Sequence, residues 1–254
     1  MILNPAQIAT REKLILTGIY LSKYGPLGLK RLGFRTFAEA YNVVGYALGS
    51  RPSSIKNYRD EFDPIFPNAR RGWHKREIRA YCRKVLDDYQ SLDFDSFSGL
   101  IKSFAGYSES AWSGIESKEG QEERGSGFAK RLITGLAAER YFESTHATIP
   151  EFRGCAIENV TQLGCGYDFK LSRNASEKFL AIEVKGLREQ TGSILLTPRE
   201  YDVAKDLQDR FFLFVVKNFQ KTPYHEIFPN PLAGNLRFTK TERVLIQVSW
   251  LTRV

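Results

Sequence analysis

FLAIEVK, residues 179–185, is typical of a β-strand, and its residues 181–185 alternate between apolar and charged side chains. Successive side chains of a strand point to opposite faces, so Ile182 and Val184 would face one side and Glu183 and Lys185 the other. An acid and an amine on one face of an apolar strand are costly to bury unless they pair or meet a metal ion and a phosphate. A solvent-exposed face with a weak ion pair is the alternative interpretation.

A second acid precedes this strand in the chain. The run GCGYDF, residues 164–169, has the composition of a turn that leads into another strand, and it places Asp168 at the start of that strand. If the two strands are neighbours, Asp168, Glu183 and Lys185 converge on one point. Two carboxylates suit Mg²⁺, a hard ion that takes oxygen ligands. Such an ion lowers the pKa of bound water, and Lys185 would offset the charge that develops on a phosphate.

The surrounding elements indicate a mixed helix and strand domain. An apolar helix is expected from Phe128 to about Ser144. Three strand-like runs follow it, at residues 156–161, 166–171 and 179–185. Thr197 and Pro198 have the chemistry of the first positions of a second helix, and residues 211–217 form a continuous apolar run typical of a central strand. The predicted order is therefore helix, three strands, helix, strand.

Two more strands are predicted, at Ser193–Leu196 and Val244–Leu251. The second follows a loop rich in proline and asparagine that contains Pro223, Pro229 and Pro231. We expect this last strand to pack on the edge of the sheet.

This order of elements resembles the PD-(D/E)xK restriction-endonuclease-like nucleases over about ninety residues. The runs GYDFKL, AIEVKG, LTPREYDVA and FFLFVV are most similar to the domain at the C-terminus of the plant NOV protein, which also occurs in bacterial restriction proteins. Carried over position by position, Asp168, Glu183 and Lys185 fall on the metal-binding and catalytic positions of that superfamily. Tyr167 stands where the name-giving proline would be, and that proline is dispensable in much of the superfamily.

The resemblance implies a restriction-endonuclease-like αβββαβ core with a mixed sheet and an endonuclease that requires Mg²⁺, for which Mn²⁺ can substitute. It also makes Glu139 a candidate metal ligand, because some relatives contribute an acid from the first core helix. A solvent-facing acid beside Arg140 is the alternative. The loop at residues 186–192, with Arg188 and Gln190, either lies along the nucleic-acid backbone or is an ordinary connection.

The N-terminal half is predicted to be helical, because its apolar residues recur at helical spacing from Pro5 to about Tyr89. Residues 37–58 resemble a helix-turn-helix, with a turn at residues 48–51 and a second helix that starts at Pro52 or Ser53. In that arrangement the second helix enters the major groove of DNA. Its exposed base readers would be Ser53, Ser54, Lys56 and Asn57, with Ile55 and Tyr58 turned inward. A plain helical hairpin is the alternative.

A basic stretch follows at residues 68–84, with Glu77 as its one acid. Phosphate binding is the natural use of such a stretch, and a solvated helix face is the alternative. The candidate phosphate contacts are Arg70, Arg71, Lys75, Arg76 and Arg79. The acidic run that precedes it, residues 59–63, is interpreted as pairing with the basic stretch or as capping, and not as a metal site. A net charge of +8 also favours polyanionic partners.

These patterns divide the chain into a helical DNA-binding domain (1–106), a linker rich in Ser, Gly and Glu (107–127) and a nuclease domain (128–254). The N-terminus lacks a signal-type apolar run, and nowhere are there about 18 consecutive apolar residues. We therefore expect a cytoplasmic α+β (α/β) protein with no membrane partner.

The leading hypothesis is an endonuclease that acts on double-stranded DNA in restriction or phage defence. Cleavage of both strands would need a homodimer on DNA, because one core cuts one strand. The chain has no GxxxxGK[ST] phosphate loop, so a separate partner would supply any ATPase or methyltransferase activity. A DNA-binding regulator with an inactive nuclease fold and an RNA nuclease are the alternatives.

Overall fold

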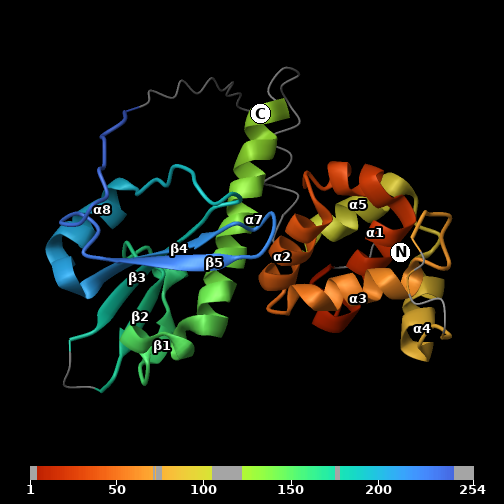
Figure 1. Ribbon diagram of the computed structural model, residues 1–254, viewed down its shortest axis with the longest axis horizontal. Coiled ribbons are helices and arrows are strands. Elements are labelled where there is room, and N and C mark those ends of the chain that lie inside the picture. The colour runs from red at the N-terminus through yellow and green to blue at the C-terminus, as the bar shows by residue number, and fades with distance from the viewer. Residues whose placement is uncertain (1–4, 71, 73–75, 105–121, 175–177, 243–254) are drawn as a thin grey trace, which may run out of the picture.

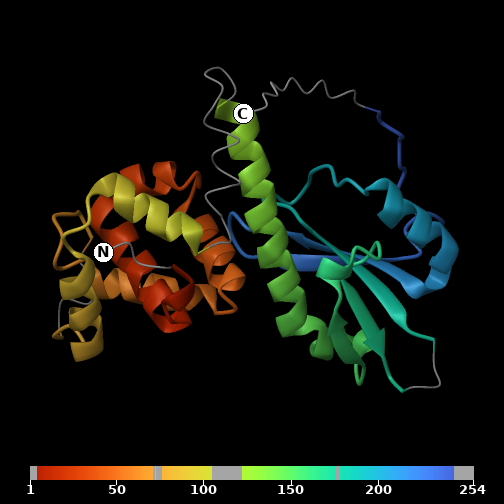
Figure 2. The ribbon, with the colours of Figure 1, turned by 180° about the vertical axis from the view of Figure 1, so that it is seen from behind.

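The computed structural model describes residues 5–70, 72, 76–104, 122–174 and 178–242. Figure 1 shows a group of helices on one side and a β-sheet on the other, with the long helix α7 (Glu122–Thr145) between them, and Figure 2 shows the same arrangement from behind. The helices of the first group come from the N-terminal half of the chain, and the strands come from the C-terminal half. The chain therefore has the expected α+β architecture.

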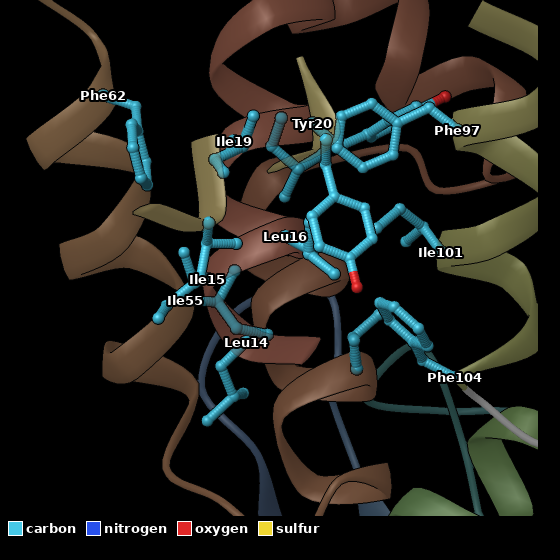
Figure 3. Packing of buried hydrophobic residues seen from close by; sticks show 14 of the residues in the cluster. Leu14, Ile15, Leu16, Ile19, Tyr20, Ile55, Phe62, Phe97, Ile101 and Phe104 are labelled. Carbon is cyan, nitrogen blue, oxygen red and sulfur yellow. The ribbon is translucent and has the colours of Figure 1, made fainter. Parts of the chain in front are cut away.

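Five helices of the N-terminal half surround one apolar core. They are α1 (Thr10–Arg31), α2 (Phe37–Ala47), α3 (Pro52–Phe62), α4 (Ala80–Tyr89) and α5 (Phe94–Ser103). Figure 3 shows Leu16, Ile19 and Tyr20 of α1 packed among side chains of the other helices, including Ile55 of α3 and Phe97 of α5. Each apolar side chain buried in this way stabilises the fold by about 1.5–3 kcal/mol. This packing makes the N-terminal half a globular unit with its own core.

The C-terminal half is built on a five-stranded mixed sheet in the order β1-β2-β3-β4-β5. Its strands are β1 (Ala156–Asn159), β2 (Phe169–Ser172), β3 (Leu180–Gly186), β4 (Phe211–Lys217) and β5 (Tyr224–Pro229). Only β3 and β4 pair in parallel, and helix α8 (Pro198–Leu207) connects them. Helix α7, three strands, α8 and β4 thus follow one another in the predicted αβββαβ order, with β5 added.

The two faces of the sheet are covered by different helices. Ile182 and Val184 of β3 belong to a core that includes Ala137 and Ala138 of α7. The residues that alternate with them lie on the other face, where Ala181 packs with Ala204 and Phe211 under α8. The predicted alternation in residues 181–185 is therefore confirmed, and Glu183 and Lys185 share the face on which α8 lies.

The structure corrects several predicted elements. Residues 193–196 are not a strand, because they form the approach to α8 and have no ladder partner in the described part of the chain. Strand β5 lies within the segment that was predicted to be a loop. Its Pro229 ends an edge strand, where a missing N–H interrupts no ladder on the outer side. Helix α7 begins at Glu122, six residues before the predicted start and within the expected linker.

Other sequence predictions fall on residues that are not described, namely the strand at 244–251 and most of the linker. The domain boundaries stay predictions. Among the described helices, none combines the length and apolar character that a bilayer crossing requires.

Helix α2 contributes to both halves of the molecule. Its Ala40, Tyr41 and Val44 belong to the core of the helical half. Val43, on the same helix, is 1% exposed and belongs to the core between α7 and the sheet. The N-terminal half is therefore joined to the sheet through α2, which packs on α7.

Candidate active site

The three residues predicted to form a cleavage centre lie together at the ends of β2 and β3. Asp168 directly precedes β2, and its backbone N–H donates to the carbonyl of Ile182 at 2.9 Å. Its carboxylate in turn accepts a hydrogen bond of 2.8 Å from the backbone N–H of Val184. Lys185 Nζ lies 2.6 Å from Glu183 Oε1. Backbone pairing of two neighbouring strands thus brings two acids and one amine to a single point.

A glycine turn sets the position of Asp168. Gly166 has a φ of +92°, a region that favours glycine, and a Cβ there would lie 2.8 Å from Val203 and 3.0 Å from Arg199 of α8. The guanidinium of Arg199 also donates to the carbonyl of Gly164 at 3.0 Å. The turn therefore packs directly on α8, and this contact fixes the chain two residues before Asp168.

Glu200 is a fourth member of this cluster that the sequence reasoning did not identify. Its Oε2 lies 2.9 Å from Lys185 Nζ, so the lysine is held between two carboxylates. Glu200 also completes a capping box with Thr197 at the start of α8. The motif TPRE was a visible signal for the cap, and the cap alone gives a local reason for this glutamate. Its contact with Lys185 depends on how α8 packs over β3.

Burial and mutual repulsion disfavour the ionised acids of this site. Burial, with a further contribution from Asp168, raises the pKa of Glu183 to about 9. Burial raises the pKa of Asp168 itself to about 6. Burial works against the ammonium of Lys185, but Glu183 and Glu200 outweigh it and raise the lysine pKa. The cluster therefore holds more acids than its one amine neutralises.

Glu139 of α7 extends the acidic site from the opposite side of β3. Burial first, and then the charge of Asp168, raise the pKa of Glu139 to about 7. The neighbouring Arg140 forms its ion pair with Glu143, at 2.6 Å. Glu139 thus senses the charge of the other acids, as expected for a residue close to the same centre.

The oxygen donors of this site fit a divalent cation. Within the described ranges, no three Asp, Glu, His or Cys side chains are close enough to form a complete metal cage. Mg²⁺ does not need one, because it is held by one or two carboxylates and keeps waters or substrate phosphate oxygens as its other ligands. Asp168 and Glu183 supply that number of carboxylates. Burial is the largest cause that raises the pKa of both, and a bound cation would favour the ionised forms that burial disfavours.

The predicted base readers lie on α3. Helices α2 and α3 and the turn between them occur at the predicted positions. Ser53, Lys56 and Asn57 are exposed and Ser54 is half-buried, while Ile55 is fully buried. The helix therefore has the predicted exposed and buried faces except at Ser54, which was expected to be exposed and which accepts a hydrogen bond from Ser50 Oγ at 3.4 Å. DNA reading by the exposed face stays a prediction.

The predicted phosphate contacts of the basic stretch form ion pairs within the protein. Three of them are described, and all three contact acids at the end of α3. The pairs are Arg70 with Asp60 and Asp63, and Arg76 and Arg79 with Glu61. The predicted pairing of residues 59–63 with the basic stretch is thus confirmed. The arginine side chains remain between 34% and 48% exposed, and Arg71 and Lys75 lie outside the described residues.

Comparison with known protein families gives one match. Residues 138–228 match the model of the family described as protein NO VEIN, C-terminal. The matched region contains β1 to β4, α8 and β5 up to Phe228, and it includes Asp168, Glu183, Lys185 and Glu200 as well as Glu139. No curated protein and no solved structure matches the chain.

Proposed function

We propose that this protein is a metal-dependent endodeoxyribonuclease of the PD-(D/E)xK type. The observation that carries the proposal is the convergence of Asp168, Glu183 and Lys185 at the ends of β2 and β3. The αβββαβ order of elements and the family match, which extends over the whole site, also support it.

The acids of the site have the chemistry to hold the metal. The carboxylates of Asp168 and Glu183 would hold Mg²⁺ or Mn²⁺, with Glu139 as an additional acid on the side of α7. When bound, the ion supplies polarisation of the phosphate and a lowered pKa of bound water. Cation binding would also favour the ionised form of Asp168 and Glu183, against the effect of burial.

Lys185 would act on the reacting phosphate or on the attacking water. Its ammonium has three N–H donors, and the contacts with Glu183 and Glu200 account for two of them. The third donor would orient the water or offset the negative charge that develops on the phosphate oxygens. Because the two glutamates raise its pKa, Lys185 stays charged at neutral pH. Glu200 is a positioning residue in this account.

The proposed biological role follows from the resemblance to restriction proteins and not from the geometry of the site. We propose a cytoplasmic restriction or phage-defence enzyme in which the exposed residues of α3 read double-stranded DNA and a homodimer cuts both strands. A separate ATPase or methyltransferase would complete such a system.

The test is cleavage of plasmid, phage and modified DNA with Mg²⁺ or Mn²⁺ by the wild type, Asp168→Ala and Lys185→Ala. Lys217→Ala is a matched control for the loss of a paired lysine, because Lys217 on the neighbouring strand β4 pairs at 2.6 Å with Glu226 of β5 and is similarly buried. We expect both site variants to lose cleavage and keep DNA binding, while the control keeps both.

Other outcomes select between the alternatives. Unchanged cleavage in both site variants would overturn the assignment of the centre. A panel of duplex DNA, single-stranded DNA and RNA separates a DNA nuclease from an RNA nuclease. Binding without cleavage on every substrate would favour a regulator with an inactive nuclease fold.

A further inference from the structure

Helix α2 is anchored to the turn that follows β4. The side-chain amide of Asn42 donates to the carbonyls of Phe219 and Lys221, at 2.8 and 2.7 Å. The hydroxyl of Thr36, the N-cap of α2, donates to the carbonyl of Gln220 at 3.0 Å. Asn42 is 7% exposed, so its two bonds are shielded from water. The helical half thus holds the backbone of this turn directly.

The turn after β4 is in turn bonded to the segment that follows β3. The backbone N–H of Gln220 donates to Arg188 O and that of Asn218 donates to Glu189 O, both at 3.0 Å. The N–H of Leu187 donates to the carbonyl of Val216 at 2.7 Å. The two segments therefore form one hydrogen-bonded platform under α2.

A buried ion pair joins this platform to α2. Glu39 is 2% exposed, and its Oε1 accepts from Nε of Arg188 in the loop after β3. The other carboxylate oxygen accepts from the backbone N–H of Arg35 at 2.8 Å. Nη2 of Arg188 is buried and has no hydrogen-bond partner within the described residues. A buried pair with an unsatisfied donor is a poor source of stability, and fixing a geometry is a better-attested use of such pairs.

Only two residues separate this ion pair from Lys185. Gly186, between them, packs against α7 so closely that a Cβ would lie 2.6 Å from the carbonyl oxygen of Thr134. Leu187 is held by its bond to Val216. Residues 186–187 therefore have little conformational freedom, so a shift of Arg188 would move the end of β3 and Lys185 with it.

We propose that Glu39 and Arg188 are positioning residues that fix the end of β3, and with it Lys185, relative to α2. Because α2 is also the first helix of the predicted DNA-reading pair, this contact sets the active site at a constant position with respect to bound DNA. The catalytic consequence rests on the proposed function. The structural consequence, an ordered loop after β3, does not depend on the proposed function.

The same two segments carry a matched control. Arg35, directly before the N-cap of α2, pairs with Glu189 at 3.2 Å, and the two side chains are 67% and 57% exposed. This pair joins the same elements across the same boundary but is open to solvent. Exposed pairs contribute little, so its removal should leave the loop in place.

The experiment compares Glu39→Gln, Arg188→Gln and the double variant with Glu189→Gln in the full chain. Hydrogen exchange is measured at the amides of Leu187, Asn218 and Gln220, and kcat and KM are measured for DNA cleavage. We expect each single variant to speed exchange and to lower kcat by about 10- to 100-fold with little change in KM, since small misplacements of a reacting group have effects of that size. The double variant, in which two amides can pair, should be less impaired than the sum of the single changes. Glu189→Gln should match the wild type.

The outcomes separate this proposal from the proposed function. Unchanged exchange and kcat in both single variants, or an equal loss in Glu189→Gln, would overturn the positioning role. If the wild type cuts no substrate, the proposed function fails and exchange alone decides the role of the pair. If Arg188→Gln does not fold, Arg188→Lys, which keeps the charge but loses the planar guanidinium, gives the same comparison.

Discussion

The helical half and the sheet each bury a cluster of charged side chains, and the two clusters are balanced in different ways. At the end of α3 the acids meet an equal or larger number of arginines. Burial works against the ionised form of Glu61, but hydrogen bonds and charge from Arg79 outweigh it and lower the glutamate pKa. Burial and repulsion in the sheet instead raise the pKa of Asp168 and Glu183.

This difference separates the cluster at α3, which is structural, from the cluster at β3, which we propose to be functional. In the network at α3, Asp60, Glu61 and Asp63 each pair with an arginine of the helical half, and these pairs hold the arginines against the end of that helix. Among the described residues, the ion pairs of the cluster at β3 set Lys185 against Glu183 and Glu200, with Asp168 beside them, and this is why we propose that it takes a positively charged ligand. The same substitution should therefore have opposite effects at the two places.

The largest effect is expected for Glu183→Gln. We expect cleavage to fall on the order of 10³-fold, because the metal loses a carboxylate and Lys185 loses an ionic partner. The free energy of unfolding should stay the same or rise, since the change removes a buried acid whose ionised form is disfavoured. Cleavage assays and urea denaturation measure the two effects. A large loss of stability would instead place Glu183 with the structural cluster.

The second effect is expected for Glu61→Gln, which breaks the network at α3. The side chain of Glu61 is 2% exposed and pairs with Arg76 and Arg79, so neutralising it should cost about 3 kcal/mol of stability. Asp95→Asn is the control, because Asp95 forms an exposed pair with Arg31 that should contribute less than about 1 kcal/mol. Urea denaturation compares the variants. Equally small losses of stability in Glu61→Gln and Asp95→Asn would show that the α3 network does not stabilise this region.

A smaller effect is expected from pH, with opposite signs for the two clusters. The folded pKa of Glu183 is raised from 4.5 to about 9, so without metal its contribution to stability falls as the pH rises across that interval. The folded pKa of Glu61 is lowered, so its contribution is present above 4.5 and is lost as the pH falls through the folded value. Thermal denaturation of the wild type and the two Gln variants checks this. Glu183→Gln should flatten the alkaline side and Glu61→Gln the acid side.

The smallest effect on stability is expected on the exposed face of α3. Asn57→Ala should weaken DNA binding by about 1–3 kcal/mol if Asn57 reads a base, and should leave unfolding unchanged because the side chain is exposed. Arg79→Ala should instead lower stability first, since Arg79 holds Glu61. Binding titrations beside denaturation separate the two effects. Loss of binding in Arg79→Ala without loss of stability would restore its role as a phosphate contact.

The sequence predicted those helices and strands whose pattern of apolar and polar residues lies within the element itself. The alternation in residues 181–185 predicted which side chains share a face, and the apolar run 211–217 predicted β4 at both of its ends. Strand β5 was missed because Pro229, at its end, and the flanking Pro223 and Pro231 are typical of a loop, and Pro229 is tolerated because β5 lies at the sheet edge. Residues 193–196 were wrongly predicted as a strand, because apolar composition does not reveal whether a partner strand is within reach.

The candidate site was predictable only as far as its residues lie on adjacent strands. Asp168, Glu183 and Lys185 could be brought together on the assumption that β2 and β3 pair. Glu200 could not, because its contact with Lys185 depends on the docking of α8. The basic stretch shows the same limit. The sequence showed that acids lie nearby, and the tertiary contacts determine that each described arginine engages one of them.

Helix α2 belongs to both apolar cores, and this determines how the protein unfolds and which of its parts can be exchanged. A helix that supplies Val43 to one core and Val44 to the other links their melting, so the two halves should lose structure in one cooperative transition. A fragment that begins after α2 would expose the apolar surface that Val43 covers. Recombination between relatives would therefore have to keep the sheet and α2 together. A chimera with a different DNA-reading module would have to join the chain beyond α2.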